Sequence, residues 1–189
     1  MRHRLAASAI ASALLAATPF AQAADPPACP DPARPSKPEI AFGPEGGAEA
    51  LVLKAIASAR ASLRLGAYAF SSPAIVKALV AARQRGVDVQ VVVDRKHNVD
   101  TDPKRIGRDA LAALAAAGIP ARINGEFRLH HDKFVVADRC HVQTGSYNYA
   151  ESANRNSENV LVLWNDRESA AAYLAHWESR FAKGVPFGE

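Results

Sequence analysis

The feature that most constrains the fold of this chain is a short β-branched segment enclosed by two helical patterns. Five of the seven residues from Val87 to Val93 are valine, a composition typical of a central β-strand. Ser71-Ser72-Pro73 supplies residues that start a helix upstream, and Gly86 ends that helix just before the strand. After the strand and a polar loop comes an Ala-rich helical pattern with Leu111 and Leu114, closed by Gly118 and Pro120. Helix, strand and helix in this order indicate an α/β protein.

The remaining segments extend this alternation in both directions. Upstream, a helical pattern begins at Ala48, and the apolar run from Leu63 to Phe70 indicates a buried strand. Downstream, a tight turn is expected near Asp138-Arg139, and a C-terminal helix carries Tyr173, Leu174, Trp177 and Phe181. Between the Ala-rich helix and this one lie three strand-like segments, Phe127 to Ala137, Val142 to Gly145 and Val160 to Trp164. The whole pattern predicts a mixed β-sheet sandwiched between helices on both faces.

The first 47 residues differ from the rest of the chain. Arg2, His3 and Arg4 precede an apolar run from Leu5 to Ala17, and Ala21-Gln22-Ala23 places small residues where a signal peptidase cleaves. Residues 1–23 are therefore predicted to be a signal peptide, so the protein is expected to be exported, to the periplasm or the exterior. Residues 24–47 are expected to form an extended Pro- and Gly-rich arm, and residues 48–189 the folded domain. No other apolar run approaches the length of a membrane span, so we expect no stable membrane insertion.

Two cysteines remain after the predicted cleavage, Cys29 in the arm and Cys140 in the domain. In an oxidising compartment they are candidates for a disulfide that ties the arm to the domain and contributes about 2–4 kcal/mol. The alternative is two unpaired thiols; export favours the disulfide because free thiols are a liability there.

One stretch of the sequence carries chemistry. His131 is followed by Lys133, by Asp138 after four more residues, and by Gly145-Ser146 and Asn148 after a further six. Given the histidine, five further positions are specified, and each is matched by chance roughly one time in twenty, so the pattern is a strong signal. It resembles the HKD signature of the phospholipase D superfamily. Together with Asn156-Ser157-Glu158-Asn159, the single motif and the predicted signal peptide, it is most similar to the small secreted bacterial endonucleases of that superfamily, over most of residues 45–182.

This resemblance implies a metal-independent phosphodiesterase with no cofactor, whose catalytic residues are His131, Lys133, Asp138 and Glu158. Residues two apart on a strand point to the same face, so His131 and Lys133 are expected to project together. Imidazole is a nucleophile that is largely neutral near pH 7, and the lysine charge stabilises phosphoryl oxygens. Asp138 is expected to fasten the turn at the end of the strand. Glu158 is a candidate to orient the imidazole through its second ring nitrogen.

The loop after this strand pair is expected to bind the substrate phosphate. Gly145 permits a sharp bend, and the side chains of Ser146 and Asn148 can donate hydrogen bonds to phosphate oxygens. Exposed backbone N–H groups at the start of the following helical turn would add to this cradle.

A single motif has a consequence for assembly. In-line displacement at phosphorus needs an attacking group on one side and a proton donor on the other. None of the other histidines is followed two residues later by lysine, so the missing half must come from a second copy of the chain. We therefore expect a homodimer with the active site on its two-fold axis, where the two His131 side chains exchange roles.

Other interpretations of these residues stay open. His130, His131, Asp132 and His141 are close enough in sequence to suggest a metal site, but adjacent strand residues face opposite ways and a nearby lysine repels cations. The polar loop after the valine-rich strand holds Arg95, Lys96, Lys104 and Arg105, which either follow a nucleic-acid backbone or form a solvated loop. Tyr147 and Tyr149 are candidates to stack on bases.

Three functions remain in competition. The leading hypothesis is an endonuclease that hydrolyses DNA, with RNA as a further candidate substrate. It would show little sequence preference and act through a phosphohistidine intermediate. The alternative is a phospholipase D that hydrolyses phosphatidyl lipids such as phosphatidylcholine, although no amphipathic membrane-docking segment is evident. A non-catalytic nucleic-acid-binding dimer is the third; binding needs basic charge and not a histidine nucleophile. The charge is only mildly basic, since 21 basic residues face 19 acidic ones once Arg2 and Arg4 are removed.

Overall fold

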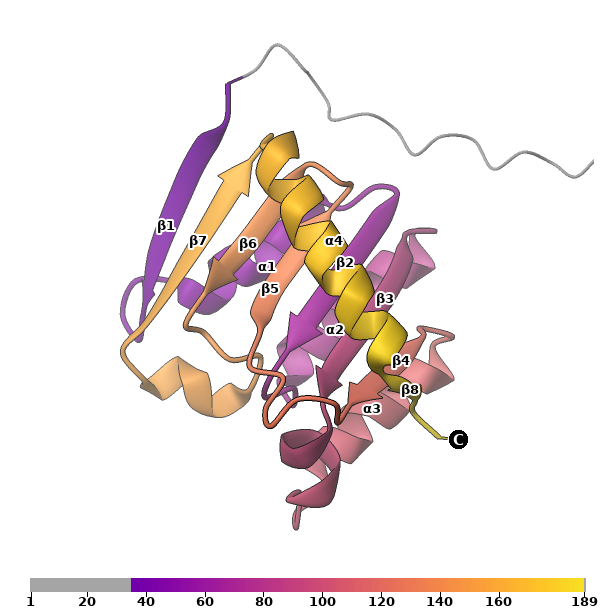
Figure 1. Ribbon diagram of the computed structural model, residues 1–189. Helices are drawn as coiled ribbons and strands as arrows, with labels where there is room; N and C mark the ends of the chain where they lie inside the picture. The colour runs from indigo at the N-terminus through magenta and orange to yellow at the C-terminus, as the bar shows by residue number, and fades with distance from the viewer. Residues whose placement is uncertain (1–34, 189) are drawn as a thin grey trace, which may run out of the picture.

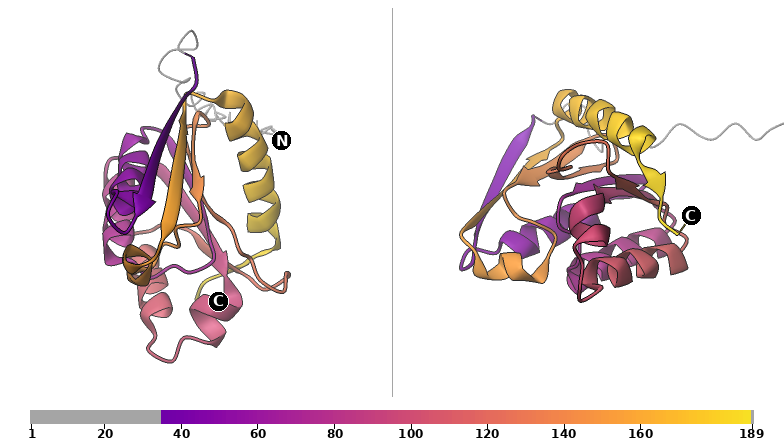
Figure 2. Two further views of the ribbon diagram at one scale, coloured as in Figure 1. Left: turned by 90° about the vertical axis from the view of Figure 1, so that its left-hand side faces the viewer. Right: turned by 60° about the horizontal axis from the view of Figure 1, so that its bottom comes forward.

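The computed structural model describes residues 35–188, which form one eight-stranded mixed β-sheet with helices on both faces (Figures 1 and 2). The strand order is β1-β7-β6-β5-β2-β3-β4-β8. The predicted fold class is confirmed. The strands are β1 (Lys37–Gly43), β2 (Ser62–Ala67), β3 (Asp88–Asp94), β4 (Ala121–Asn124), β5 (Lys133–Ala137), β6 (His141–Gly145), β7 (Glu158–Trp164) and β8 (Val185–Pro186). The α-helices are α1 (Ala48–Ser58), α2 (Pro73–Gln84), α3 (Ile106–Ala116) and α4 (Arg167–Lys183).

The sheet has two halves that meet between β2 and β5. Strands β2, β3 and β4 are parallel to one another, whereas β5, β6 and β7 are each antiparallel to their neighbours. Helices α1, α2 and α3 cover one face, and α4 alone crosses the other (Figure 2). Leu63, Leu65, Ala67, Val135 and Ala137 belong to the larger core with residues of α1 to α3, while Phe134 and Val136 belong to the smaller core with residues of α4. The ends of β2, β3 and β6 and the start of β5 therefore lie at one edge of the sheet, the lower edge in Figure 1.

Helix starts follow the local sequence. The hydroxyl oxygen of Ser72 accepts a hydrogen bond from the backbone N–H of Ile75 (3.4 Å), and Pro73 occupies the first turn of α2. Asp166 caps α4 in the same way, accepting from the N–H of Ser169 (2.9 Å). Among residues 35–188, no helix is long and apolar enough to cross a bilayer.

Two segments differ from the expected secondary structure. Lys37–Gly43, within the expected arm, forms edge strand β1 and pairs with the whole of β7. The strand expected over Phe127–Ala137 begins only at Lys133. Residues 127–132 are irregular, and their hydrogen bonds leave the strand pattern: the Asp94 carboxylate accepts the N–H of His130 (2.7 Å), and the Asp132 carbonyl oxygen accepts the N–H of Tyr68 (2.8 Å). His131 thus precedes the strand that was expected to carry it.

The predicted signal peptide and Cys29 lie outside the described residues, so export and the disulfide stay predictions. Cys140 is buried beside the turn between β5 and β6.

Candidate active site

His131 and Lys133 lie together where β5 begins. The Lys133 Nζ is 3.3 Å from Nδ1 and 3.4 Å from Nε2 of His131, and it donates a hydrogen bond to the His131 carbonyl oxygen (3.0 Å). The imidazole is exposed, whereas the lysine is only 9% exposed. A buried ammonium group is thus held directly against an accessible ring.

The surroundings favour the neutral form of the imidazole. Desolvation first, and the positive charge of Lys133 second, lower the pKa of His131, while Asp94 and Asp132 act in the opposite direction. Burial also lowers the pKa of Lys133, against the opposing charges of Asp132 and Glu158. A neutral imidazole has the ring lone pair that a nucleophile needs.

Tyr68, directly after β2, contacts both members of this pair. Its ring centroid is 4.4 Å from that of His131, and Lys133 Nζ lies 5.2 Å from the same centroid. His97 packs on Tyr68 from another side, with centroids 4.6 Å apart. Sequence reasoning missed Tyr68, although its place at the carboxyl end of a parallel strand, where α/β proteins bind ligands, was a usable signal.

The expected phosphate-binding loop follows β6 at the same edge of the sheet. Gly145 has φ 152°, and a Cβ there would lie 2.2 Å from the carbonyl oxygen of Asn159, so only glycine fits. The Ser146 hydroxyl donates to Glu158 and accepts from the N–H of Asn159 (3.0 Å). Oδ1 of Asn148 is buried and has no hydrogen-bond partner in the described part of the chain. This unused atom is an acceptor, whereas the expected phosphate contact would use the N–H donors of the same amide.

The carboxylate of Glu158, which was expected to orient the imidazole, binds other groups within the described chain. It accepts hydrogen bonds from Ser146 and from Nδ2 of Asn156 (3.1 Å). The negative charge of Glu158 acts on Lys133, where it opposes the lowering of the lysine pKa by burial. The reason is register: Gly145 pairs with Val160, which leaves Glu158, at the start of β7, beside the Ser146 loop.

Asp138 lies at the opposite end of β5 from Lys133, away from the reactive pair. Its carboxylate accepts three backbone hydrogen bonds, from Arg60 (2.8 Å), Ala61 (2.7 Å) and Ser62 (2.9 Å). The expectation that Asp138 fastens a turn is therefore modified: it fastens the start of β2 to the end of β5. This contact sets the register of the two strands and so the position of Lys133.

The cations of the expected nucleic-acid loop are all exposed. Arg95 and Lys96 begin a π-helical turn, Lys96–Asp100, and with Arg128 they line a hollow of about 300 Å³. His97 of this turn connects it to Tyr68. Lys104 and Arg105 lie directly before α3.

The tyrosines proposed for base stacking are core residues. Tyr147 and Tyr149 are both fully buried, and their hydroxyl groups donate to Asn154 (2.5 Å) and Gln143 (2.6 Å). The expectation was wrong because both pack against α1, α2 and their neighbours in the larger core. Among residues 35–188, no group of three or more His, Cys, Asp or Glu side chains is placed to hold a metal ion.

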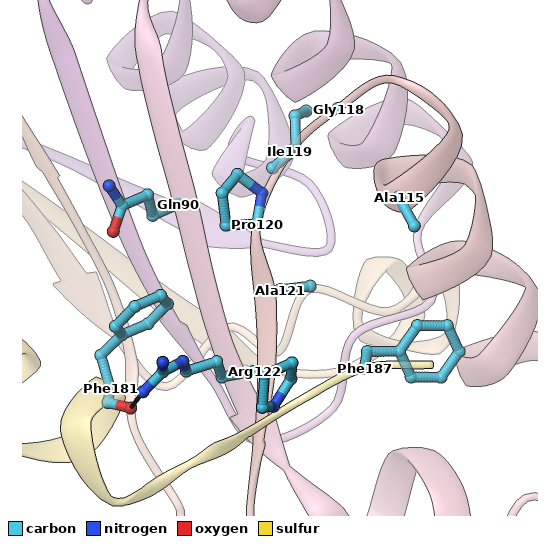
Figure 3. Close-up of a pocket in the computed structure, with 10 residues that line it drawn as sticks. Gln90, Ala115, Gly118, Ile119, Pro120, Ala121, Arg122, Phe181 and Phe187 are labelled. Atoms are coloured by element: carbon cyan, nitrogen blue, oxygen red, sulfur yellow. Dashed lines mark hydrogen bonds between the residues drawn. The ribbon is translucent and has the colours of Figure 1, made fainter. Parts of the chain in front are cut away.

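Two further hollows lie on the surface of the described residues. One, of about 450 Å³, opens between the reactive pair and α4. The other, of about 550 Å³, lies around β4 and the C-terminus (Figure 3). Its one charged lining residue, Arg122, donates to the Phe181 carbonyl oxygen (3.0 Å) and stacks on the Phe181 ring, so its charge is already used.

Comparison with known proteins places this site in a family. Residues 52–181 match the family model described as cardiolipin synthase, PLD-like domain. The chain belongs to the phospholipase D superfamily. A phospholipase D of Rickettsia bellii is 35% identical over 149 residues, which cover 78% of this chain and 71% of the relative. The mitochondrial cardiolipin hydrolase of Homo sapiens is 34% identical over 149 residues, 74% of this chain and 57% of that relative.

Solved structures agree with this assignment. Nuc from Salmonella typhimurium, a phospholipase D family member, is 40% identical with a TM-score of 0.78, covering 82% of this chain and 100% of Nuc. NucT from Helicobacter pylori shares the fold, with a TM-score of 0.70 at 21% identity. The chain is accordingly a phosphodiesterase of the phospholipase D superfamily.

Proposed function

We propose that this phospholipase D superfamily member is a metal-independent endonuclease that hydrolyses DNA with little sequence preference. The contact between the exposed imidazole of His131 and the buried ammonium of Lys133 carries this proposal. It provides a nucleophile and a fixed positive charge at one accessible point. The 40% identity to Nuc, over the whole length of Nuc, supports the nuclease assignment.

The chemistry follows from this arrangement. A ring nitrogen of His131 attacks phosphorus, forming an N–P bond as the bond from phosphorus to the leaving oxygen breaks. Lys133 and the amide of Asn148 stabilise the negative charge on the phosphoryl oxygens. A proton donor opposite His131 protonates the leaving oxygen, then takes a proton from water as water attacks the phosphohistidine and releases the imidazole.

We assign the proton donor to His131 of a second copy, across a two-fold axis. The described residues contain one His-x-Lys pair, and its imidazole faces solvent. The sheet face that α4 leaves uncovered offers an apolar surface to that copy. Ile40 and Phe42 of β1 are each 60% exposed, and in register they pair with Leu161 and Asn159 of β7.

A phosphatidyl lipid is the second candidate substrate, because relatives at 35% and 34% identity bear the names phospholipase D and mitochondrial cardiolipin hydrolase. The same two steps would hydrolyse a lipid phosphodiester.

Plasmid nicking in excess EDTA tests the proposal. We expect the parent and His141→Gln to nick, and His131→Gln to be inactive. His141 is a suitable control because it lies at the far end of β6 from the site, where it accepts from the backbone N–H of Asn165 (2.9 Å). Nicking by His131→Gln would refute the nucleophile. An intact plasmid with the parent, together with hydrolysis of phosphatidylcholine or cardiolipin vesicles, would replace the nuclease by the lipid enzyme.

A further inference from the structure

The hollow between the reactive pair and α4 is continuous with the site of chemistry. It measures about 450 Å³, within the range of small-molecule sites. His131 and Lys133 line one end, and Ala172, Tyr173 and His176 of α4 line the other. A phosphate held at Lys133 would have one of its ester substituents inside this hollow.

The charged side chains that line the hollow favour an uncharged occupant beside the phosphate. Asp132 points toward α4, where its carboxylate contacts Nε2 of His176 (2.8 Å) and lies 3.5 Å from Nδ1 of the buried His130. The carboxylate is therefore satisfied within the protein, and it would repel a second phosphate group. Lys133 remains as the charge that receives the anion.

The wall of the hollow is aromatic. The half-buried Tyr173 packs edge-on against Phe134, with centroids 5.0 Å apart, and His176 lies 5.9 Å from the same ring. A ring supported in this way is a stacking surface for a planar base, a contact worth about 1–3 kcal/mol in single-strand binding. His176, fixed by Asp132, adds a polar group with a side chain 38% exposed.

We propose that this hollow is a subsite for the nucleoside that adjoins the scissile phosphate, with Tyr173 as its stacking surface and His176 as its polar wall. This inference rests on the proposed nuclease function. It identifies determinants of substrate preference on α4, outside the HKD motif.

Two esters that release the same leaving group test it: thymidine 5′-(p-nitrophenyl phosphate) and methyl p-nitrophenyl phosphate. The measured quantity is the ratio of kcat/KM for the thymidine ester to kcat/KM for the methyl ester. We expect Tyr173→Ala and Ala172→Trp, which fills the hollow, to lower this ratio by about tenfold, as for the loss of one stacking contact. Ala171→Trp is the matched control, since Ala171 is exposed on the same helix but does not line the hollow.

His176 has its own pair of variants. His176→Gln keeps a side-chain donor for Asp132 and should retain more of the preference than His176→Ala. A parent that nicks plasmid but shows a ratio unchanged by Tyr173→Ala and Ala172→Trp would overturn the subsite alone. A parent that fails to nick plasmid and hydrolyses both esters equally would instead remove the nuclease function on which the subsite depends.

Discussion

Asp94 and His130 are 36 residues apart in sequence, yet the Asp94 carboxylate accepts the backbone N–H of His130 at 2.7 Å. Its other oxygen accepts the N–H of His97 (2.6 Å), so one buried side chain at the end of β3 fixes both the residue before His131 and the turn that packs on Tyr68. The irregular segment that presents the imidazole is therefore fixed by the Asp94 side chain and by the backbone N–H of Tyr68, which donates to the Asp132 carbonyl oxygen (2.8 Å), and not by a continuous strand ladder.

Asp94→Ala should therefore lower both stability and activity. Two backbone donors lose their acceptor, and we expect the free energy of unfolding in urea to fall by about 2–4 kcal/mol. Activity at a temperature where the variant is fully folded should also fall, because His131 loses an anchor. Asp100→Ala, at an exposed aspartate of the same turn, should change stability by less than about 0.5 kcal/mol. Equal stability of the two variants would contradict the anchoring role.

Tyr68 should act through its ring. Tyr68→Phe keeps the face that contacts His131 and Lys133 and should retain most of kcat/KM. Tyr68→Leu removes both contacts and should lower kcat/KM by about tenfold, the scale of one partly buried cation–π contact. If the leucine and phenylalanine variants have the same kcat/KM, the ring contacts do not contribute.

The pH dependence should show a nucleophile with a lowered pKa. Since the attacking imidazole must be neutral, and since the pKa of His131 is below its ordinary value of 6.5, activity should persist to a lower pH than an unperturbed histidine allows. The acid limb of the kcat/KM profile should accordingly lie below pH 6.5.

Desolvation is the largest cause of that lowered pKa and the charge of Lys133 the second, and the second can be tested without turnover. In Lys133→Gln the neighbouring positive charge is gone, so the pKa of His131, followed by NMR of the ring C–H signal, should rise. Lys96→Gln removes an exposed cation of the π-helical turn and should leave the titration unchanged. A titration identical in all three proteins would exclude the lysine as a cause.

Asp138 should contribute to stability more than to chemistry. Asp138→Ala removes the acceptor of three N–H groups, and we expect unfolding free energy to fall by about 2–4 kcal/mol. The molecules that remain folded should keep far more activity than His131→Gln. Complete inactivity of folded Asp138→Ala protein, established by circular dichroism, would instead place this carboxylate in the reaction.

The uncovered face of β1 should matter for dimerisation. Ile40→Lys combined with Phe42→Lys should shift the protein toward monomers in light scattering and lower its activity per chain, most strongly on dilution. Val185→Lys, at an exposed apolar residue of β8 on the other edge of the sheet, is the matched control. A doubly substituted protein that stays dimeric would move the interface elsewhere, and a fully active monomer would refute the shared site.

Periodicity predicted the fold well where an element carries its own signals. The valine-rich β3, the Ser72-Pro73 start of α2 and the C-terminal helix are specified by nearby residues. Lys37–Gly43 was predicted to belong to an arm because residues 24–47 are rich in proline and glycine and show little periodicity. An edge strand tolerates such residues, and β7 supplies the pairing.

The site was predictable only in part for a related reason. The HKD spacing predicted that His131 and Lys133 lie together, and they do. The residues that surround the pair come from distant segments of the chain. Tyr68 precedes His131 by 63 residues; its place at a strand end indicates a binding region, but nothing in the sequence pairs it with His131. Glu158 was assigned to the imidazole from the resemblance of its segment to that of related nucleases, whereas the register of β6 and β7 decides which groups it meets within the chain.

The junction between the two halves of the sheet links activity to the completeness of folding. The parallel strands β2, β3 and β4 and their helices are finished by Asn124, before the reactive histidine occurs in the chain. The His131 segment is held from two parts of the chain. Tyr68 and Asp94 contact it from the ends of β2 and β3, and His176 contacts it from α4. A nascent chain or a fragment that ends at Asn124 can contain β2, β3 and β4 with their helices, but it lacks His131 and Lys133 and so has no active site. Recovery of turnover during refolding should therefore report the final, long-range docking step, later than any signal from helix formation.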